Sequence, residues 1–181
     1  MIAFVVVLIR LLTPFSILRW PFGGVLLSIA ADAFDITVLR AFGWGFLNEA
    51  SYQAVDKVFD MYYLSFAFYV SLKWKDLLAK KTSVILFIWR FIGAALFEIT
   101  GGRKLLFFAP NIFENFYILA VGIPKISPKF RLDSKKKLAA ILLIAGVPKI
   151  AQEYIMHFME YPLGLGNLWP FIKQTISKAL L

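Results

Sequence analysis

Polar side chains recur inside the apolar stretches of this sequence, where they could bind a cation or a small polar solute, or relay a proton. Ionisable groups at such positions are costly and usually face a bundle interior or a wet cavity. Lys149, Glu153 and His157 follow one another at intervals of four residues, so a helix places them on one face. The candidate binding or relay residues are Arg90, Glu98, Asn111, Glu114, Lys149, Glu153 and His157. They predict a polar pocket that opens toward the outer side of a membrane.

Four aspartates form a second set of candidate site residues. Asp32 and Asp35 lie one helical turn apart, and Asp56 and Asp60 repeat that spacing. Carboxylate oxygens are the ligands that hard divalent cations prefer. The four aspartates are therefore candidate metal ligands, and a divalent cation such as Mg²⁺ is the one cofactor that the sequence suggests.

The same charges have a plainer interpretation. Arg90 and Lys149 could pair with Glu98, Glu114 or Glu153 and only fasten helices together, at about 1 kcal/mol per contact. The carboxylates inside the apolar segments outnumber the bases there. Excess buried carboxylates must be protonated, hydrated or bound to a cation. This excess favours a binding or relay site over pairing alone.

The composition indicates which elements must position these residues. Of 181 residues, 60% are hydrophobic and 17% are charged, whereas soluble domains carry about 25% charged residues. A soluble domain of this size could not bury so much apolar surface. The sequence therefore predicts an all-α integral membrane protein in contact with a lipid bilayer.

The apolar stretches predict a single transmembrane domain over residues 1–181. A helix needs about 20 apolar residues to cross the hydrocarbon core. The chain offers about six such transmembrane helices, at 1–18, 21–39, 56–72, 83–100, 105–123 and 138–158. Residues 163–181 interleave apolar side chains with lysines, which predicts a C-terminal amphipathic helix at the membrane interface.

The basic residues predict an orientation. Lysine and arginine concentrate in short cytoplasmic loops of membrane proteins. With six crossings, Arg19 and the loops 73–82 and 124–137 share a side and hold eleven basic residues, against six on the other side. The two loops are therefore predicted to be cytoplasmic, and residues 40–55 to lie outside.

Two observations exclude other classes of protein. The chain has no cysteine and one histidine, which excludes disulfides, thiolate nucleophiles and zinc sites that need several such residues. A net charge of +9 could indicate a protein that binds nucleic acid. No nucleic-acid partner is expected, because the basic residues fall between apolar runs, as in loops that flank membrane spans.

The four aspartates also carry a family resemblance. Residues 32–40 read Asp-Ala-Phe-Asp-Ile-Thr-Val-Leu-Arg, and residues 52–60 read Tyr-Gln-Ala-Val-Asp-Lys-Val-Phe-Asp. This resembles the CDP-alcohol phosphotransferase motif, with Ile36, Leu39 and Tyr52 in place of its small residues. The resemblance implies six membrane spans, four aspartates that hold a divalent metal and help to activate an acceptor alcohol, and head-group transfer onto a lipid.

Three functions are consistent with these features, and the sequence leaves open whether the chain is an enzyme. The leading hypothesis is small-solute or cation transport, or a channel subunit, working as a homo-oligomer. The first alternative is a metal-dependent membrane enzyme of the CDP-alcohol phosphotransferase type that acts on lipid head groups. The second is an accessory or scaffold membrane protein whose charges only specify helix packing.

Overall fold

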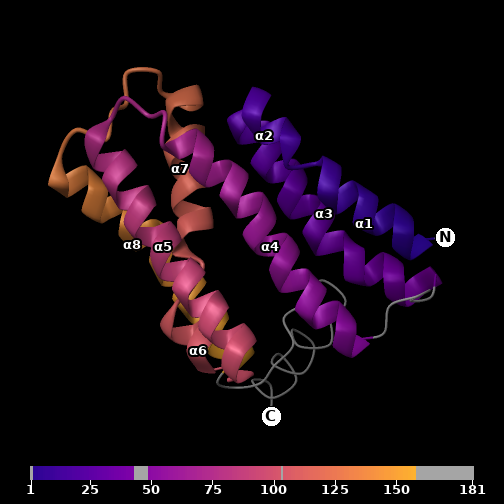
Figure 1. Cartoon of the computed structure of the whole chain (residues 1–181). Helices are drawn as coiled ribbons and strands as arrows, with labels where there is room; N and C mark the ends of the chain where they lie inside the picture. Colours follow the sequence, from indigo (N-terminus) through magenta and orange to yellow (C-terminus); the bar gives the residue numbers. More distant parts are fainter. Residues whose placement is uncertain (1, 43–48, 103, 158–181) are drawn as a thin grey trace, which may run out of the picture.

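The computed structural model describes residues 2–42, 49–102 and 104–157 of the chain. These residues form helices joined by short turns, without a β-strand among them (Figure 1). The helices are α1 (Ile2–Leu12), α2 (Phe15–Arg19), α3 (Pro21–Phe42), α4 (Glu49–Ser71), α5 (Leu77–Thr100), α6 (Lys104–Phe108), α7 (Ile112–Ile126) and α8 (Lys135–His157). The predicted all-α class is confirmed. The predicted interfacial helix 163–181 lies outside the described residues.

Five helical segments are long and apolar enough to cross a membrane. They are Ile2–Arg19, Pro21–Leu39, Leu77–Thr100, Leu105–Ile126 and Lys135–Ile155. The first joins α1 to α2 across a break at Thr13 and Pro14, and the fourth joins α6 to α7 across a second break. This makes the chain a multi-pass membrane protein.

Helix α4 is the sixth long element of the bundle. Its 23 residues reach about 35 Å, enough to cross the hydrocarbon core. Asp56, Lys57 and Asp60 distinguish it from the five apolar segments. It packs against α2, α3, α5 and α7 and runs antiparallel to α3 and α5 (Figure 1). Since α3 and α5 start from the same end of the bundle, α4 must return the chain to that end.

The boundaries of the helices differ from the prediction at the basic loops. The expected loop 73–82 shrinks to a turn at 72–76, and the expected loop 124–137 shrinks to 127–134. Helix α7 continues through Pro124 into its last turn. Lysines with long apolar stems can extend a helix past the hydrocarbon core into the head-group region, so they do not stop it. The two short loops lie at the end of the bundle that holds α2, whose last residue is Arg19, and we call this the basic end (Figure 1).

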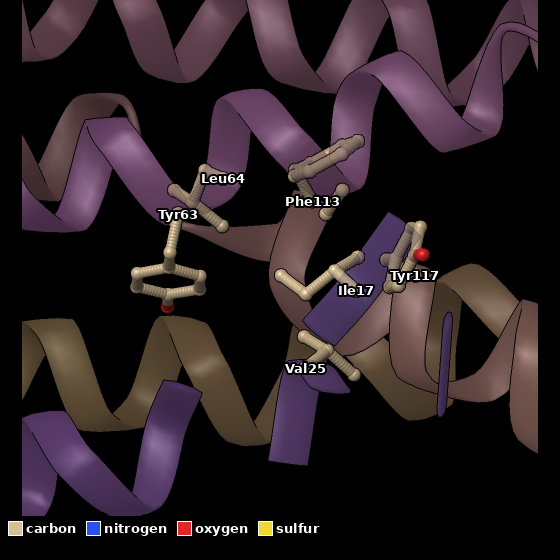
Figure 2. Packing of buried hydrophobic residues seen from close by; sticks show 7 residues of the cluster. Ile17, Val25, Tyr63, Leu64, Phe113 and Tyr117 are labelled. Atoms are coloured by element: carbon tan, nitrogen blue, oxygen red, sulfur yellow. The ribbon is translucent and has the colours of Figure 1, made fainter. Parts of the chain in front are cut away.

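The centre of the bundle is an aromatic and aliphatic core. Ile17, Val25, Leu64, Phe113 and Tyr117 are fully buried and join α2, α3, α4 and α7 (Figure 2). The outer surface carries many large apolar side chains instead, among them Phe4, Trp89, Ile99 and Val147. Lipid is the solvent that such a surface requires.

Two glycines allow helices to approach closely. A Cβ atom on Gly24 of α3 would lie 2.4 Å from the backbone nitrogen of Ile17 in α2. A Cβ atom on Gly93 of α5 would lie 2.1 Å from the Cβ atom of Ala109, at the break between α6 and α7. These contacts fix α2 on α3 and the helix break on α5.

The break between α6 and α7 leaves backbone carbonyls that helix α5 satisfies. Trp89 donates from Nε1 to the Phe108 carbonyl at 3.0 Å, and Arg90 donates from Nη1 to the Ala109 carbonyl at 3.0 Å. Pro110 has no N–H and ends α6. Non-helical backbone inside a membrane persists only where protein or water pairs its polar groups. Arg90 therefore has a structural partner within the bundle.

Candidate functional site

Arg10 of α1 reaches all four predicted aspartates. Its Nη2 atom lies 2.6 Å from Asp32 Oδ1 and 3.4 Å from Asp60 Oδ1, and its Nη1 atom lies 3.1 Å from Asp56 Oδ1. Nη1 also pairs with Asp35 Oδ2. We call Arg10 and these four aspartates the acidic cluster. It joins one face of α1 to facing sides of α3 and α4.

The carboxylates of the acidic cluster have the spacing of a cation site. One oxygen each from Asp32, Asp35 and Asp56 lies within 4.8 Å of the other two. A cation bound at about 2.0–2.6 Å holds its oxygen ligands at most about 5 Å apart. Asp32 Oδ1 touches Arg10 without the alignment of a hydrogen bond, and no other donor reaches it within the described residues. The donor set therefore fits a hard divalent cation.

Two further side chains border the acidic cluster on α4. Lys57 Nζ lies 3.0 Å from Asp56 Oδ2 and 3.6 Å from Asp60 Oδ2. The Phe59 ring lies 5.2 Å from the Arg10 guanidinium carbon, a cation–π distance. When all groups are ionised, four carboxylates against Arg10 and Lys57 leave a formal charge of −2.

The acidic cluster lies deep in the bundle. Arg10 and Asp35 are each 4% exposed. Arg10 is near the middle of the segment 2–19, Asp32 is near the middle of α3, and Asp60 is near the middle of α4. Their side chains meet at mid-length, where the surrounding helices give the most shielding.

A second polar group continues from the acidic cluster across the bundle. Tyr63 lies one turn after Asp60 on α4 and donates a hydrogen bond from its hydroxyl to Glu114 of α7. The amide of Asn111 donates to Glu114 Oε2 at 2.9 Å, and Lys149 Nζ of α8 lies 3.9 Å from Glu114 Oε1. We call Tyr63, Asn111, Glu114 and Lys149 the Glu114 group.

The acidic cluster and the Glu114 group adjoin. Tyr63 lies one helical turn after Asp60 on α4, so the two side chains project from the same face of that helix. Figure 2 shows the Tyr63 hydroxyl directed away from Leu64. Polar side chains from α1, α3, α4, α7 and α8 thus form one layer through the middle of the bundle.

The structure brings together some of the residues that the sequence grouped into one pocket and leaves others apart. Asn111, Glu114 and Lys149 meet in the Glu114 group, where the Asn111 side chain also caps the N-terminus of α7 by accepting from the Glu114 N–H. Glu98 is exposed on α5, more than two turns beyond Arg90, so the two do not share a site.

The other two predicted residues lie on α8. Glu153 is buried there. His157 is the last residue of α8, and its side chain lies outside the described residues. Glu98 lies apart from the Glu114 group, while an outward-facing pocket stays a prediction. Helical periodicity gives the face on which a side chain lies but not the neighbour that this face meets.

An apolar groove leads to the acidic cluster from the lipid side. A hollow of about 450 Å³ lies between α1 and α3, lined by Val5, Ile9, Leu27, Phe34 and Val38 among others. Asp35 also lines this hollow. The carboxylate most deeply held by Arg10 is thus adjacent to a surface that suits a hydrocarbon chain.

Sequence reasoning missed three members of this polar layer. Arg10 is the one charged residue in the first 18 positions, and that isolation was the available signal. Lys57 lies three residues before Asp60 on α4, and Tyr63 lies three residues after it, so all three share one helix face. Comparison with known protein families, curated proteins and solved structures finds no match. Fold and site define the class as a polytopic helical membrane protein with a buried cluster of aspartates around one arginine.

Proposed function

We propose that the chain is a metal-dependent membrane enzyme that acts on lipid head groups, with the acidic cluster as the site of a divalent cation such as Mg²⁺. One observation carries the proposal: two carboxylates from α3 and two from α4 surround the Arg10 guanidinium at mid-length of the bundle, and oxygens of Asp32, Asp35 and Asp56 lie within 4.8 Å of one another. The motif shared with the CDP-alcohol phosphotransferases points to the same four residues.

The charge of the site supports a cation as its ligand. Arg10 and Lys57 offset two of four buried carboxylates, and one divalent cation would offset the remaining −2. Uncompensated carboxylates inside a low-dielectric bundle are otherwise driven to take up protons. A bound divalent cation would polarise phosphoryl oxygens and neutralise their charge.

The groove between α1 and α3 supports a lipid as the substrate. Its apolar walls suit an acyl chain, and Asp35 at its edge places the polar end of that lipid next to the carboxylates. In the reaction that the resemblance implies, an acceptor hydroxyl would attack the phosphorus that carries the alcohol of a CDP-linked donor. The phosphoanhydride bond would break, CMP would leave, and a carboxylate would take up the hydroxyl proton. Asp32 is suited to that role, because its side chain is the most accessible of the four, at 33% exposed.

Cation binding is tested by thermal unfolding in detergent with and without Mg²⁺ or Mn²⁺. We expect either cation to raise the midpoint in the wild type and to lose this effect in Asp32→Asn and Asp56→Asn. Asp76→Asn is the matched control, since Asp76 lies at the basic end. If the wild type melts at the same temperature with and without the cation, the acidic cluster is not a metal site.

Enzyme activity is tested separately with labelled lipid donors in proteoliposomes, CDP-linked alcohols among them. Turnover that needs the divalent cation and is lost in Asp32→Asn supports the proposal. If the chain binds the cation but turns over no donor, it is a cation-binding protein and the proposed enzyme activity is wrong. If neutralising each aspartate changes neither binding nor stability, the accessory or scaffold role is the one that fits.

Cation or small-solute transport is the second candidate, and the continuous polar layer favours it. Side chains from Arg10 to Lys149 form a path of ionisable groups through the bundle, which suits a relay. At this size the protein would work as a homo-oligomer. Flux into liposomes that is unchanged by Glu114→Gln combined with Glu153→Gln would exclude this role.

The orientation distinguishes between these functions. The excess of lysine and arginine at the basic end favours its placement on the cytoplasmic side, with residues 40–55 outside. A CDP-alcohol is a cytosolic donor and would have to reach the acidic cluster from that side. A lipid substrate can reach the cluster from the groove, whichever end faces the cytoplasm.

A further inference from the structure

The basic end of the bundle contains a cavity that takes no part in the acidic cluster. Its volume is about 510 Å³, within the range of about 300–1,000 Å³ that small-ligand sites occupy. The turn 72–76 supplies Trp74 and Lys75, and the loop 127–134 supplies Phe130 and Arg131. Two turns that are 50 residues apart in sequence therefore enclose it.

Two cations of the cavity have no acidic partner. Within the described residues neither Lys75 nor Arg131 forms an ion pair. Of the two acids that line the cavity, Asp133 is held by Lys137 at 2.8 Å, and Asp76 lies at the N-terminus of α5, where the helix dipole stabilises its charge. Lys75, Arg131 and Lys137 against Asp76 and Asp133 leave the site with a formal charge of +1.

The surroundings add to this positive charge. Ten basic residues against two acids occupy the stretches 73–81 and 125–137. The basic residues are Lys73, Lys75, Lys80, Lys81, Lys125, Lys129, Arg131, Lys135, Lys136 and Lys137. An anion would be attracted to this end of the molecule from a distance of about one Debye length.

The remaining walls of the cavity are apolar and aromatic. Trp74 stacks on Tyr117 at 5.6 Å between ring centroids, which fixes the indole in the core. Ala120 and Leu132 contribute aliphatic surface. Tryptophan next to lysine and arginine at helix ends is typical of the level where phospholipid head groups lie. The cavity therefore combines a lipid-compatible wall with unpaired cations.

We propose that this cavity binds the head group of one anionic phospholipid, with its phosphate between Lys75 and Arg131 and its glycerol end against Ala120 and Leu132. Arginine offers a planar fork of donors that matches a phosphate, and lysine adds a point charge. Phosphate is the shared chemistry of a lipid head group and free inorganic phosphate. The apolar wall at a membrane-spanning bundle favours the lipid. The site shares no residue with the acidic cluster.

The test measures binding of phosphatidylglycerol to the detergent-solubilised chain by native mass spectrometry and by the shift in melting temperature. Phosphatidylcholine and inorganic phosphate are the comparison ligands. We expect saturable binding of phosphatidylglycerol alone. Combining Lys75→Gln with Arg131→Gln should weaken it about 30-fold, since each basic residue near a lipid surface contributes about 1 kcal/mol.

The matched control combines Lys81→Gln with Lys129→Gln, which removes the same charge from the same end outside the cavity. This control should keep its affinity within about threefold, because neither lysine lines the cavity and both act on the ligand only from a distance. Unchanged melting of the double variant in phosphatidylcholine shows that it folds. Lys75→Arg with Arg131→Lys should restore binding.

Three results would overturn the proposal. Equal weakening by the control pair would show a diffuse charge effect instead of a site. Equal stabilisation by inorganic phosphate would show an anion site without lipid preference. Equal binding of phosphatidylcholine would show that the charge of the head group plays no part.

Discussion

The Arg10 guanidinium of α1 and the Asp35 carboxylate of α3 form an ion pair in which each side chain is 3% exposed. Two charges at that depth remain ionised only because they pair with each other and with the neighbouring charges. Asp32, Asp56 and Asp60 surround the same guanidinium. One arginine thus links α1 to α3 and α4, and its removal has consequences for stability and for cation binding.

Arg10→Gln should lower the free energy of unfolding by about 3–5 kcal/mol, because it leaves buried carboxylates without their cation. If the acidic cluster binds divalent ions, Mg²⁺ should restore more stability to this variant than it adds to the wild type. Thermal or denaturant unfolding in detergent measures both effects. Arg19→Gln, an exposed charge at the basic end, is the control. A variant as stable as the control would contradict the central place given to Arg10.

Tyr63→Phe removes the hydrogen bond from α4 to Glu114 of α7. A hydrogen bond to a charged group contributes about 1.5–3 kcal/mol, so a loss of that size is expected. Asn111 and Lys149 still contact Glu114, which limits the damage. Tyr69→Phe, at an exposed position, should change the stability little. Identical unfolding of the two variants would show that the Glu114 group contributes nothing to the bundle.

Gly93→Ala should destabilise the bundle by about 1–3 kcal/mol, because the added methyl collides with Ala109 at the helix break. Combining it with Ala109→Gly removes the opposing methyl and should restore most of the loss. Gly146→Ala on α8 is the control, since its nearest neighbour would lie at 3.6 Å. Unfolding midpoints of the three variants measure the effect. Failure of the double substitution to recover stability would contradict this packing.

Sidedness can be measured with single cysteines, since the natural chain has none. On the charge distribution, Ala41→Cys should react with an impermeant maleimide on intact cells, and Lys129→Cys should react only after lysis. That result leaves the lipid groove or the outer side as the route for a substrate. The reverse pattern would overturn the orientation and admit a cytosolic CDP-alcohol to the four aspartates.

The pKa of Asp133 should lie below its ordinary value, because Lys137 donates a hydrogen bond to its carboxylate. A depressed pKa in the folded state means that this contact stabilises the fold above the ordinary pKa of 3.8 and is lost as the pH falls through the folded value. Carbon-13 NMR of labelled aspartate would follow the titration. Lys137→Met should return the pKa to the ordinary range. A pKa that stays low in this variant would assign the shift to another cause.

Much of the architecture could be predicted from the sequence. Apolar stretches long enough to cross a membrane give the class of protein, because lipid admits little except helices with internally paired backbones. Asp32 and Asp35 share a helix face through their spacing, as do Asp56 and Asp60. The spacing of the charges in the sequence therefore predicts which face of each helix is polar.

Only the tertiary structure decided which of these faces meet. Arg10 lies among the aspartates because α1 packs on α3, and Glu98 is exposed because α5 presents that part of its surface outward. Asn111 became a helix cap because Pro110 breaks the segment next to it. Sequence periodicity fixes the angle of each side chain about its own helix axis. The rotation of one helix against the next is set by packing, through contacts such as Gly24 on Ile17 and Gly93 on Ala109, which join residues of different elements.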